Sequence, residues 1–450
     1  MRNPTSVDRR PATLVELPLL PQQGRWLSAE ADYPDATTPL VQLVHRLRGP
    51  LDVAAWTRAV SSLVDRYEIL HTHFRSTSDG PVQVVDPPVG LAVELIDFTG
   101  RPEPEESARQ ELVERQRIRF DLGRGPLVRS VLIRLAEDDH VWAMLMHHSV
   151  ADGVSSLVLD ADLGAYYRAF AAGGEADLPE PPLQSGDYAV WRAATHRPQD
   201  DAADLRYWTA HLAGLEPIEL RGDFPRPRAK GAPAAEIRHV ISGDIADRVE
   251  DLAGATRATR FIVMLTALQV LLRAWSEQDD FCVGIPVAGA PRGEPRFANL
   301  IGPFNNLLPL RCDLAGDPTF TDVVTGNRAV LLDALVHQEL SIDRIIEAVG
   351  APHDPGRWQL CQVLLVFDEP APPPVLPLPG LSVAEFPITV PRIPYDLMIH
   401  ARLGRDGLAL RFFYDTGLFA EATVRLRIGE FERILLAVLR RPDARLSELS

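Results

Sequence analysis

The sequence is poor in cysteine, with only Cys282, Cys312 and Cys361 among 450 residues. Their wide separation fits no zinc site, in which the ligands are closely spaced. Such a low count also gives no disulfide framework and is typical of a reducing compartment. We therefore expect three buried thiols and no bound metal. The 46% hydrophobic content can form a large core without cross-links.

Positive charge is also scarce, because 62 acidic residues outnumber 46 Lys and Arg and leave a net charge of −16. Such a surface repels phosphate polymers, so neither nucleic acid nor an anionic membrane is an expected partner. Long apolar runs are missing as well. Glu16 and Pro18 interrupt the apolar run near the N-terminus, which therefore lacks the core of a signal peptide. We expect a cytoplasmic protein.

Two catalytic and binding motifs are missing. Without a Gly-x-Ser-x-Gly elbow, the sequence does not indicate a covalent acyl-enzyme. Without a Gly-rich phosphate loop, its alternating helices and strands favour an α/β sandwich over a nucleotide-binding fold. The length is typical of two domains. Residues 171–187 have the Gly, Pro and acidic composition of a linker, so we expect one lobe over residues 1–175 and a second over residues 176–450.

The most informative segment is "LMHHSVADGVSS", from Leu145 to Ser156. Residues 128–135 and 140–147 predict two strands of a hairpin with a polar turn at 137–139. After Gly153 the apolar residues recur at helical spacing. The segment therefore predicts the end of a buried strand, a tight loop and the start of a helix.

The two adjacent histidines of this segment cannot have the same role, because neighbouring residues of a strand point to opposite faces. We expect His147 to be structural and Asp152 to cap the helix. His148 is the better chemical candidate, because burial lowers the pKa of an imidazole and keeps the ring neutral. A neutral ring nitrogen can accept a proton from an attacking amine or hydroxyl, or hold that group in place. Gly153 allows close approach of a ligand to the backbone.

"HHSVADG" matches the His-His-x-x-x-Asp-Gly signature of the condensation domains of nonribosomal peptide synthetases, which resemble chloramphenicol acetyltransferase. Segments similar to the other motifs of the family follow its order along the chain: "PQQGRWL" at 21–27, "RYEILHTHF" at 66–74, "GDYAVW" at 186–191, "IGPFNNLLPLR" at 301–311, "HQELSI" at 337–342 and "HDPGRWQLCQV" at 353–363. The resemblance implies an α/β fold of two chloramphenicol acetyltransferase-like lobes, arranged in a V with a central tunnel.

The resemblance also implies roles for individual residues. His148 would be catalytic and His147 its partner in the signature, while Asp152 would pair with an arginine and Gly153 would lie beside the reacting thioester. Four further residues are candidates for lining the tunnel: Ser155, Asn305, Asn306 and Arg66.

The sequence departs from the family pattern at two places. Ala290 stands where the family often has the arginine that pairs with the signature aspartate, which leaves Arg292 and Arg296 as alternative partners of Asp152. The segment Asn305–Leu307 stands where Val-Asn-Thr is usual, and this change hints at an unusual substrate.

On this resemblance we expect an acyltransferase of natural-product biosynthesis that forms amide or ester bonds. It would have no cofactor of its own and would use a thioester on the phosphopantetheine arm of a carrier protein. The chain begins with Met1, and no carrier motif follows, so we expect a free-standing monomer that meets its peptidyl or acyl carrier in trans and takes a small-molecule or carrier-bound acceptor. The alternatives are a carrier- or coenzyme A-dependent O-acyltransferase and a catalytically silent docking domain.

Overall fold

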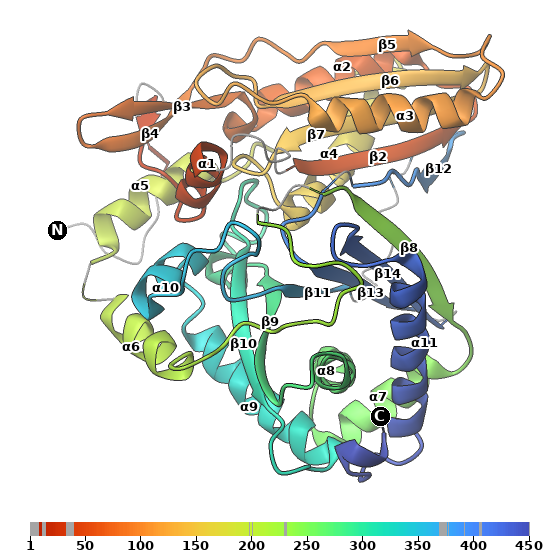
Figure 1. Cartoon of the computed structure of the whole chain (residues 1–450). Helices are drawn as coiled ribbons and strands as arrows, with labels where there is room; N and C mark the ends of the chain where they lie inside the picture. The colour runs from red at the N-terminus through yellow and green to blue at the C-terminus, as the bar shows by residue number, and fades with distance from the viewer. Residues whose placement is uncertain are drawn as a thin grey trace. The chain divides into compact units, whose positions relative to one another are not determined.

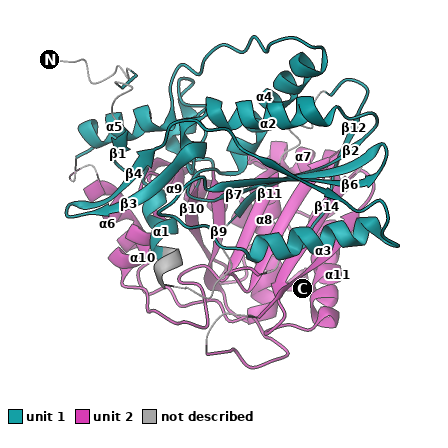
Figure 2. Ribbon diagram, turned by 90° about the horizontal axis from the view of Figure 1, so that it is seen from above, with its two compact units in different colours: residues 1–197, 288–305, 372–389 teal, residues 198–287, 306–371, 390–450 magenta. Residues whose placement is uncertain are grey.

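The computed structural model describes residues 9–10, 15–32, 40–197, 199, 201–228, 232–368, 376, 378–390, 392–404 and 407–449. The chain divides into two compact units that do not follow the order of the sequence (Figure 2). Unit 1 contains residues 1–197, 288–305 and 372–389, and unit 2 contains residues 198–287, 306–371 and 390–450.

The two units do not have the single boundary at residues 175 and 176 that the linker composition predicted. Helix α5 (Ser185–Thr195) lies beyond that position and yet belongs to unit 1. Its first turn is bonded to other parts of the unit, because Asp187 accepts from the Arg10 amide at 2.9 Å and the Gln184 side chain donates to the Arg66 carbonyl at 3.0 Å. These long-range hydrogen bonds join the start of α5 to unit 1. The V and the tunnel stay predictions.

Unit 1 contains a five-stranded sheet in the order β12-β2-β7-β6-β5 and a three-stranded sheet in the order β1-β4-β3 (Figure 1). All strand pairs are antiparallel except β5 with β6. The elements are β1 (Glu16–Leu17), α1 (Gln23–Asp32), β2 (Leu40–Arg48), α2 (Val53–Arg66), the 3₁₀ helix η1 (Glu68–His71), β3 (Thr72–Thr77), β4 (Gly80–Val85), β5 (Val93–Asp97), α3 (Pro104–Arg117), β6 (Val128–Ala136), β7 (Asp139–His147), α4 (Gly153–Ala171), α5, the 3₁₀ helix η2 (Ala290–Gly293) and β12 (Ser382–Glu385).

Strand β7 is apolar on both faces because each face meets a different set of side chains. Trp142 and Met144 belong to one buried cluster with residues of α2 and α4. Val141 and Ala143 belong to a second cluster with residues of α3. This confirms the β6–β7 hairpin and the buried strand that the sequence predicted. Consequently the histidine segment begins at the end of a fully covered strand.

Helix α2 begins after a side-chain cap and is followed by a 3₁₀ helix. Asp52 caps it, because its carboxylate accepts from the Ala55 amide at 2.9 Å. The helix ends at Arg66, and the 3₁₀ helix η1 follows from Glu68.

Unit 2 contains a six-stranded sheet in the order β10-β9-β11-β13-β14-β8. Strand β11 runs parallel to β9 and β13, and the other pairs are antiparallel. The elements are α6 (Asp201–His211), β8 (Ala234–Ile241), α7 (Ile245–Thr256), α8 (Arg260–Ser276), β9 (Asp280–Val287), β10 (Asn306–Asp313), α9 (Phe320–Val336), α10 (Ile342–Val349), β11 (Val363–Asp368), β13 (Leu397–Gly404), β14 (Gly407–Asp415), α11 (Glu421–Val438) and the 3₁₀ helix η3 (Leu446–Glu448).

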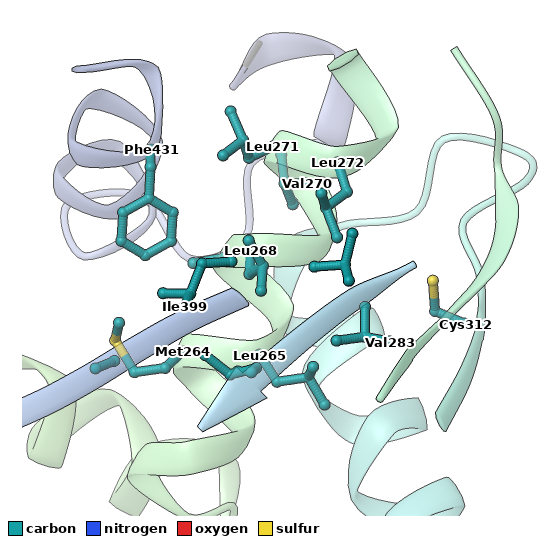
Figure 3. Close-up of a cluster of buried hydrophobic side chains, with 14 of the residues drawn as sticks. Met264, Leu265, Leu268, Val270, Leu271, Leu272, Val283, Cys312, Ile399 and Phe431 are labelled. Carbon is teal, nitrogen blue, oxygen red and sulfur yellow. The ribbon is translucent and has the colours of Figure 1, made fainter. Parts of the chain in front are cut away.

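The core of unit 2 is built around α8, whose sequence is apolar on nearly all sides, as expected of a buried helix. Figure 3 shows Leu268 of α8 among side chains from the sheet and from α11, such as Ile399 and Phe431. The three cysteines are free and buried, as the sequence predicted. The unit is therefore stabilised by apolar packing.

Among the described residues, no single helix has the length and apolarity to cross a membrane. Helices α7 and α8 meet these two criteria only when they are taken together, and the chain bends by 98° at the break between them.

We predict that Leu268→Ala lowers the free energy of unfolding by about 2–5 kcal/mol, because Leu268 is 1% exposed and its removal leaves a cavity. The matched control is Leu332→Ala on α9, where the side chain is 52% exposed and the expected change is below about 0.5 kcal/mol. Denaturant unfolding measures both, and an equal loss in the two variants would contradict the packing described.

Candidate active site

The histidine segment has the local structure that its sequence predicts. Strand β7 ends at His147, a turn closes when the Val150 amide donates to the His147 carbonyl at 3.0 Å, and α4 begins at Gly153. Asp152 caps α4 by accepting from the Ser155 amide at 2.8 Å. The Ser155 hydroxyl in turn accepts from the Asp152 amide at 3.3 Å, which completes a capping box.

The carboxylate of Asp152 is fully buried and accepts five hydrogen bonds from three separate segments of unit 1. The donors are the Ser155 amide (2.8 Å), the Ser155 hydroxyl (2.8 Å), Arg292 Nη2 (2.8 Å), the Phe304 amide (3.0 Å) and the Asn305 amide (3.2 Å). A buried charge is costly unless it is paired and bonded in this way. Asp152 therefore acts as the structural hub of the site.

Arg292 is the arginine that pairs with Asp152, which answers the question raised by Ala290. Its side chain is 4% exposed and also donates to the Ala298 carbonyl at 3.1 Å. Arg296 instead pairs with Glu294. Ala290 begins η2, so the arginine comes from two residues further along the same turn.

Gly289 brings the segments before η2 and around Phe304 together. Its φ is +90°, and a Cβ at this position would collide with the Phe304 carbonyl oxygen. Only glycine permits this close approach.

His147 has a structural environment, as predicted. It is fully buried, and its Nδ1 accepts from the Ser149 amide at 3.1 Å and lies 2.7 Å from the Ser149 hydroxyl. Because a backbone amide can only donate, Nδ1 carries no proton. Phe120 contacts the ring edge-on, with centroids 6.2 Å apart. The imidazole of His147 thus holds the loop that follows β7.

His148 has a different environment. Its ring stacks on Trp26, with centroids 4.3 Å apart and planes inclined by 21°. Its Nδ1 is buried and has no hydrogen-bond partner in the described part of the chain. Burial lowers the pKa of His148 to about 4, and the opposing effects of its own main chain and of Asp152 are smaller. The ring is therefore neutral at pH 7 and keeps one nitrogen able to accept a hydrogen bond.

Two predicted neighbours of His148 lie around the same hub. Gly153 is exposed, and a Cβ added there would meet no atom within 4 Å, so open space lies beside the first turn of α4. Asn305 donates its amide to Asp152, while its side-chain Oδ1 is buried and lacks a hydrogen-bond partner among the described residues. This Oδ1 can accept a hydrogen bond from a ligand.

The other three candidates have polar groups that the protein itself uses. Ser155 Oγ lies between Asp152 and the Gly302 amide, which donates to it at 3.0 Å. Arg66 donates to Asp162 at 2.8 Å and joins α2 to α4.

Asn306 belongs to unit 2, where its side chain donates to the carbonyls of Gln338 and Leu340 and accepts from the Leu307 amide. In this structure Ser155, Arg66 and Asn306 are thus bonded within the protein, and their place along a substrate tunnel stays a prediction.

Trp26 was missed as a site residue, although "PQQGRWL" was recognised as a motif. The signal was present, since Gln23 and Trp26 are three residues apart and lie on one face of a helix. The sequence does not show where that face of the helix lies relative to His148.

No group of three or more His, Cys, Asp or Glu side chains that could hold a metal ion occurs within the described ranges.

Both the sequence and the fold match those of one known family. The family model described as "Condensation domain" matches residues 14–450. The chain belongs to the condensation-domain family. The mixed α/β fold predicted from the sequence is that of solved condensation-domain structures.

This condensation domain is similar to segments of much longer synthetases. It is 33% identical over 447 residues to one of the linear gramicidin synthase proteins of Brevibacillus parabrevis, covering 97% of this chain and 8% of that protein. It is 32% identical over 409 residues to chondramide synthase cmdD of Chondromyces crocatus, covering 90% of this chain and 10% of that protein. The chain thus spans about a tenth or less of the length of these relatives.

Two solved structures have similar sequences and folds. The X-domain from teicoplanin biosynthesis is 26% identical, with a TM-score of 0.87 and 99% of both chains covered. The SgcC5 protein from Streptomyces globisporus is 26% identical, with a TM-score of 0.73 and 92% and 95% of the two chains covered. Condensation domains of nonribosomal peptide synthetases need no cofactor of their own, because their substrate is carried on the phosphopantetheine of a carrier protein.

We predict that Arg292→Ala lowers the free energy of unfolding by about 3–5 kcal/mol, because it leaves the buried Asp152 carboxylate without its cation. Arg296→Ala is the matched control from the same segment. Its partner Glu294 is about half exposed, so the expected loss is at most about 1 kcal/mol. Thermal and denaturant unfolding measure the stability of both variants. An equally small loss of stability in Arg292→Ala and Arg296→Ala would contradict the role of Arg292 as the partner of the buried Asp152 carboxylate.

We also predict that the His148 ring gains a proton with a midpoint pH of about 4, because its burial disfavours the charged form. An unfolded histidine titrates near 6.5. Between these values the unfolded state binds a proton that the folded state does not, so this group lowers stability as the pH falls from about 6.5 to 4. NMR of the ring nitrogens measures the midpoint, and a value near 6.5 would refute the prediction.

Proposed function

We propose that this condensation domain is an acyltransferase that forms amide or ester bonds. It transfers an acyl or aminoacyl group from a carrier-protein thioester to an amine or hydroxyl. The observation that carries the proposal is the neutral His148 ring, whose Nδ1 has no hydrogen-bond partner in the described chain. Family membership supplies the class of reaction.

In the proposed reaction the acceptor nitrogen or oxygen attacks the thioester carbonyl carbon. The carbon–sulfur bond breaks, and the phosphopantetheine leaves as the thiol after taking up the proton that the acceptor loses. A general base is most effective when its pKa is near the operating pH. With a pKa of about 4, His148 is a weak base, so its main contribution is to accept a hydrogen bond and orient the acceptor. Holding the two reactants in the right geometry lowers the activation barrier substantially by itself.

The substrates and partners belong to the proposal too. We propose that the donor arrives on a separate carrier protein in the cytoplasm, and that the acceptor is a small molecule or a second carrier-bound group. The nearest alternative is an O-acyl transfer from a carrier protein or from coenzyme A. Turnover measured with a carrier-protein thioester and with a coenzyme A thioester distinguishes these donors.

A docking role is a second candidate because of one specific likeness. The X-domain from teicoplanin biosynthesis has been solved in a complex with OxyB, and that chain is 26% identical with a TM-score of 0.86. We favour catalysis, because His148 is present and neutral. Binding of a partner protein without turnover of any thioester would instead support docking.

We predict that His148→Ala reduces acyl transfer by at least about 100-fold, the usual scale for losing a positioned acid–base or orienting group. The assay presents carrier proteins loaded with a panel of aminoacyl and acyl groups, together with amine and alcohol acceptors. Loss of the acyl group from the carrier and formation of the product are followed by intact mass.

The matched control is His140→Ala, because His140 is a buried histidine of β7, the strand that leads to His148, and its pKa is also lowered by burial. It should keep near wild-type turnover once its folding has been verified by circular dichroism. Equal turnover in wild type and His148→Ala would refute the role of His148.

A further inference from the structure

Helix α1 is fixed to the loop that carries His148 by one buried side chain. Gln23, the first residue of α1, is fully buried. Its side-chain amide donates to the carbonyl of Ser149, the residue directly after His148, at 3.2 Å. The same amide donates to Gln83 at 3.2 Å, and its oxygen accepts from the Leu20 amide at 2.7 Å. With these three bonds Gln23 holds the start of α1 against the histidine loop.

Trp26 uses this attachment to reach the His148 ring. It lies three residues after Gln23 and so points from the same side of α1. Its indole plane lies on the imidazole with 4.3 Å between the ring centroids. One turn of helix therefore supplies both a hydrogen bond to the backbone beside His148 and a flat surface for its ring.

The stack constrains the orientation of the His148 ring. Nδ1 of His148 has no hydrogen-bond partner within the described residues, so no bond at that atom fixes the orientation of the ring. The charged and titratable groups that influence it are Asp152, Arg25 and His147. Arg25 lies with its guanidinium carbon 4.8 Å from the Trp26 ring centroid. Packing against a flat indole restricts the rotation of the imidazole, which a lone charge cannot do.

We propose that Trp26 is a positioning residue, and that its indole holds the His148 imidazole in the orientation needed to bind the acceptor. The claim about ring orientation stands on the contacts alone. Its consequence for turnover rests on the function proposed above.

The test compares Trp26→Leu, which removes the stack, with Trp26→Phe, which keeps an aromatic plane without the indole N–H. Trp56→Phe is the matched control, because Trp56 is a buried tryptophan of unit 1 that packs edge-on against Trp142 and Tyr167 and not on His148. Circular dichroism and thermal unfolding establish that each variant is folded.

Two readouts are measured on the folded variants. NMR of the imidazole should show the His148 ring protons shifted by the indole ring current in wild type and in Trp56→Phe, partly in Trp26→Phe and not in Trp26→Leu. With the thioester and acceptor found by the intact-mass assay, kcat of Trp26→Leu should fall about 10- to 100-fold, as for a reacting group displaced by about 1 Å. The KM for the loaded carrier should stay near the wild-type value, and Trp26→Phe should recover most of the loss.

The proposal is overturned if Trp26→Leu is folded and leaves the His148 ring signals or kcat at the wild-type value. It is also overturned if Trp26→Phe keeps the ring shift and yet loses as much kcat as Trp26→Leu, because the stack is then not what matters. Failure of the proposed function would look different: wild type itself would turn over no thioester, while the ring signals would still decide whether Trp26 orients His148.

Discussion

The interaction on which the site depends is the set of five hydrogen bonds to the buried carboxylate of Asp152. Taking a carboxylate out of water is costly, and the cost is offset only when its oxygens are fully bonded. Here the donors come from the start of α4, from η2 and from residues 304–305. One charge therefore determines how three segments meet, and His148 and Gly153 lie just before and after it in the chain.

Two adjacent histidines have different chemistry because their partners differ. His147 is held by Ser149 through a nitrogen that accepts the Ser149 amide. His148 lies on the face of Trp26, and burial lowers its pKa to about 4. A ring that stays neutral at pH 7 suits binding of an acceptor more than storage of a proton. His147 is the last residue of β7 and His148 is the first residue of the turn that follows, so the two side chains meet different surroundings.

The composition of unit 1 explains how distant residues reach this site. Two segments that lie within the second half of the sequence, 288–305 and 372–389, belong to unit 1. The first supplies Arg292 and the amides of residues 304 and 305, and Gly289 permits its tight approach to Phe304. The second adds β12 to the edge of the sheet beside β2. Backbone and charge pairing thus bring these segments into the unit.

Local features of the chain were predictable from the sequence, because they depend on neighbouring residues. Two strand-like runs with a polar turn between them predicted the β6–β7 hairpin, and residue type predicted the Asp152 cap. Only the tertiary structure decided that Arg292, 140 residues away, pairs with Asp152, that Trp26 stacks on His148, and that Arg66 is used between helices. The physical reason is that the role of a polar side chain depends on the partner that packing brings to it, and the spacing of residues along the chain does not encode that partner.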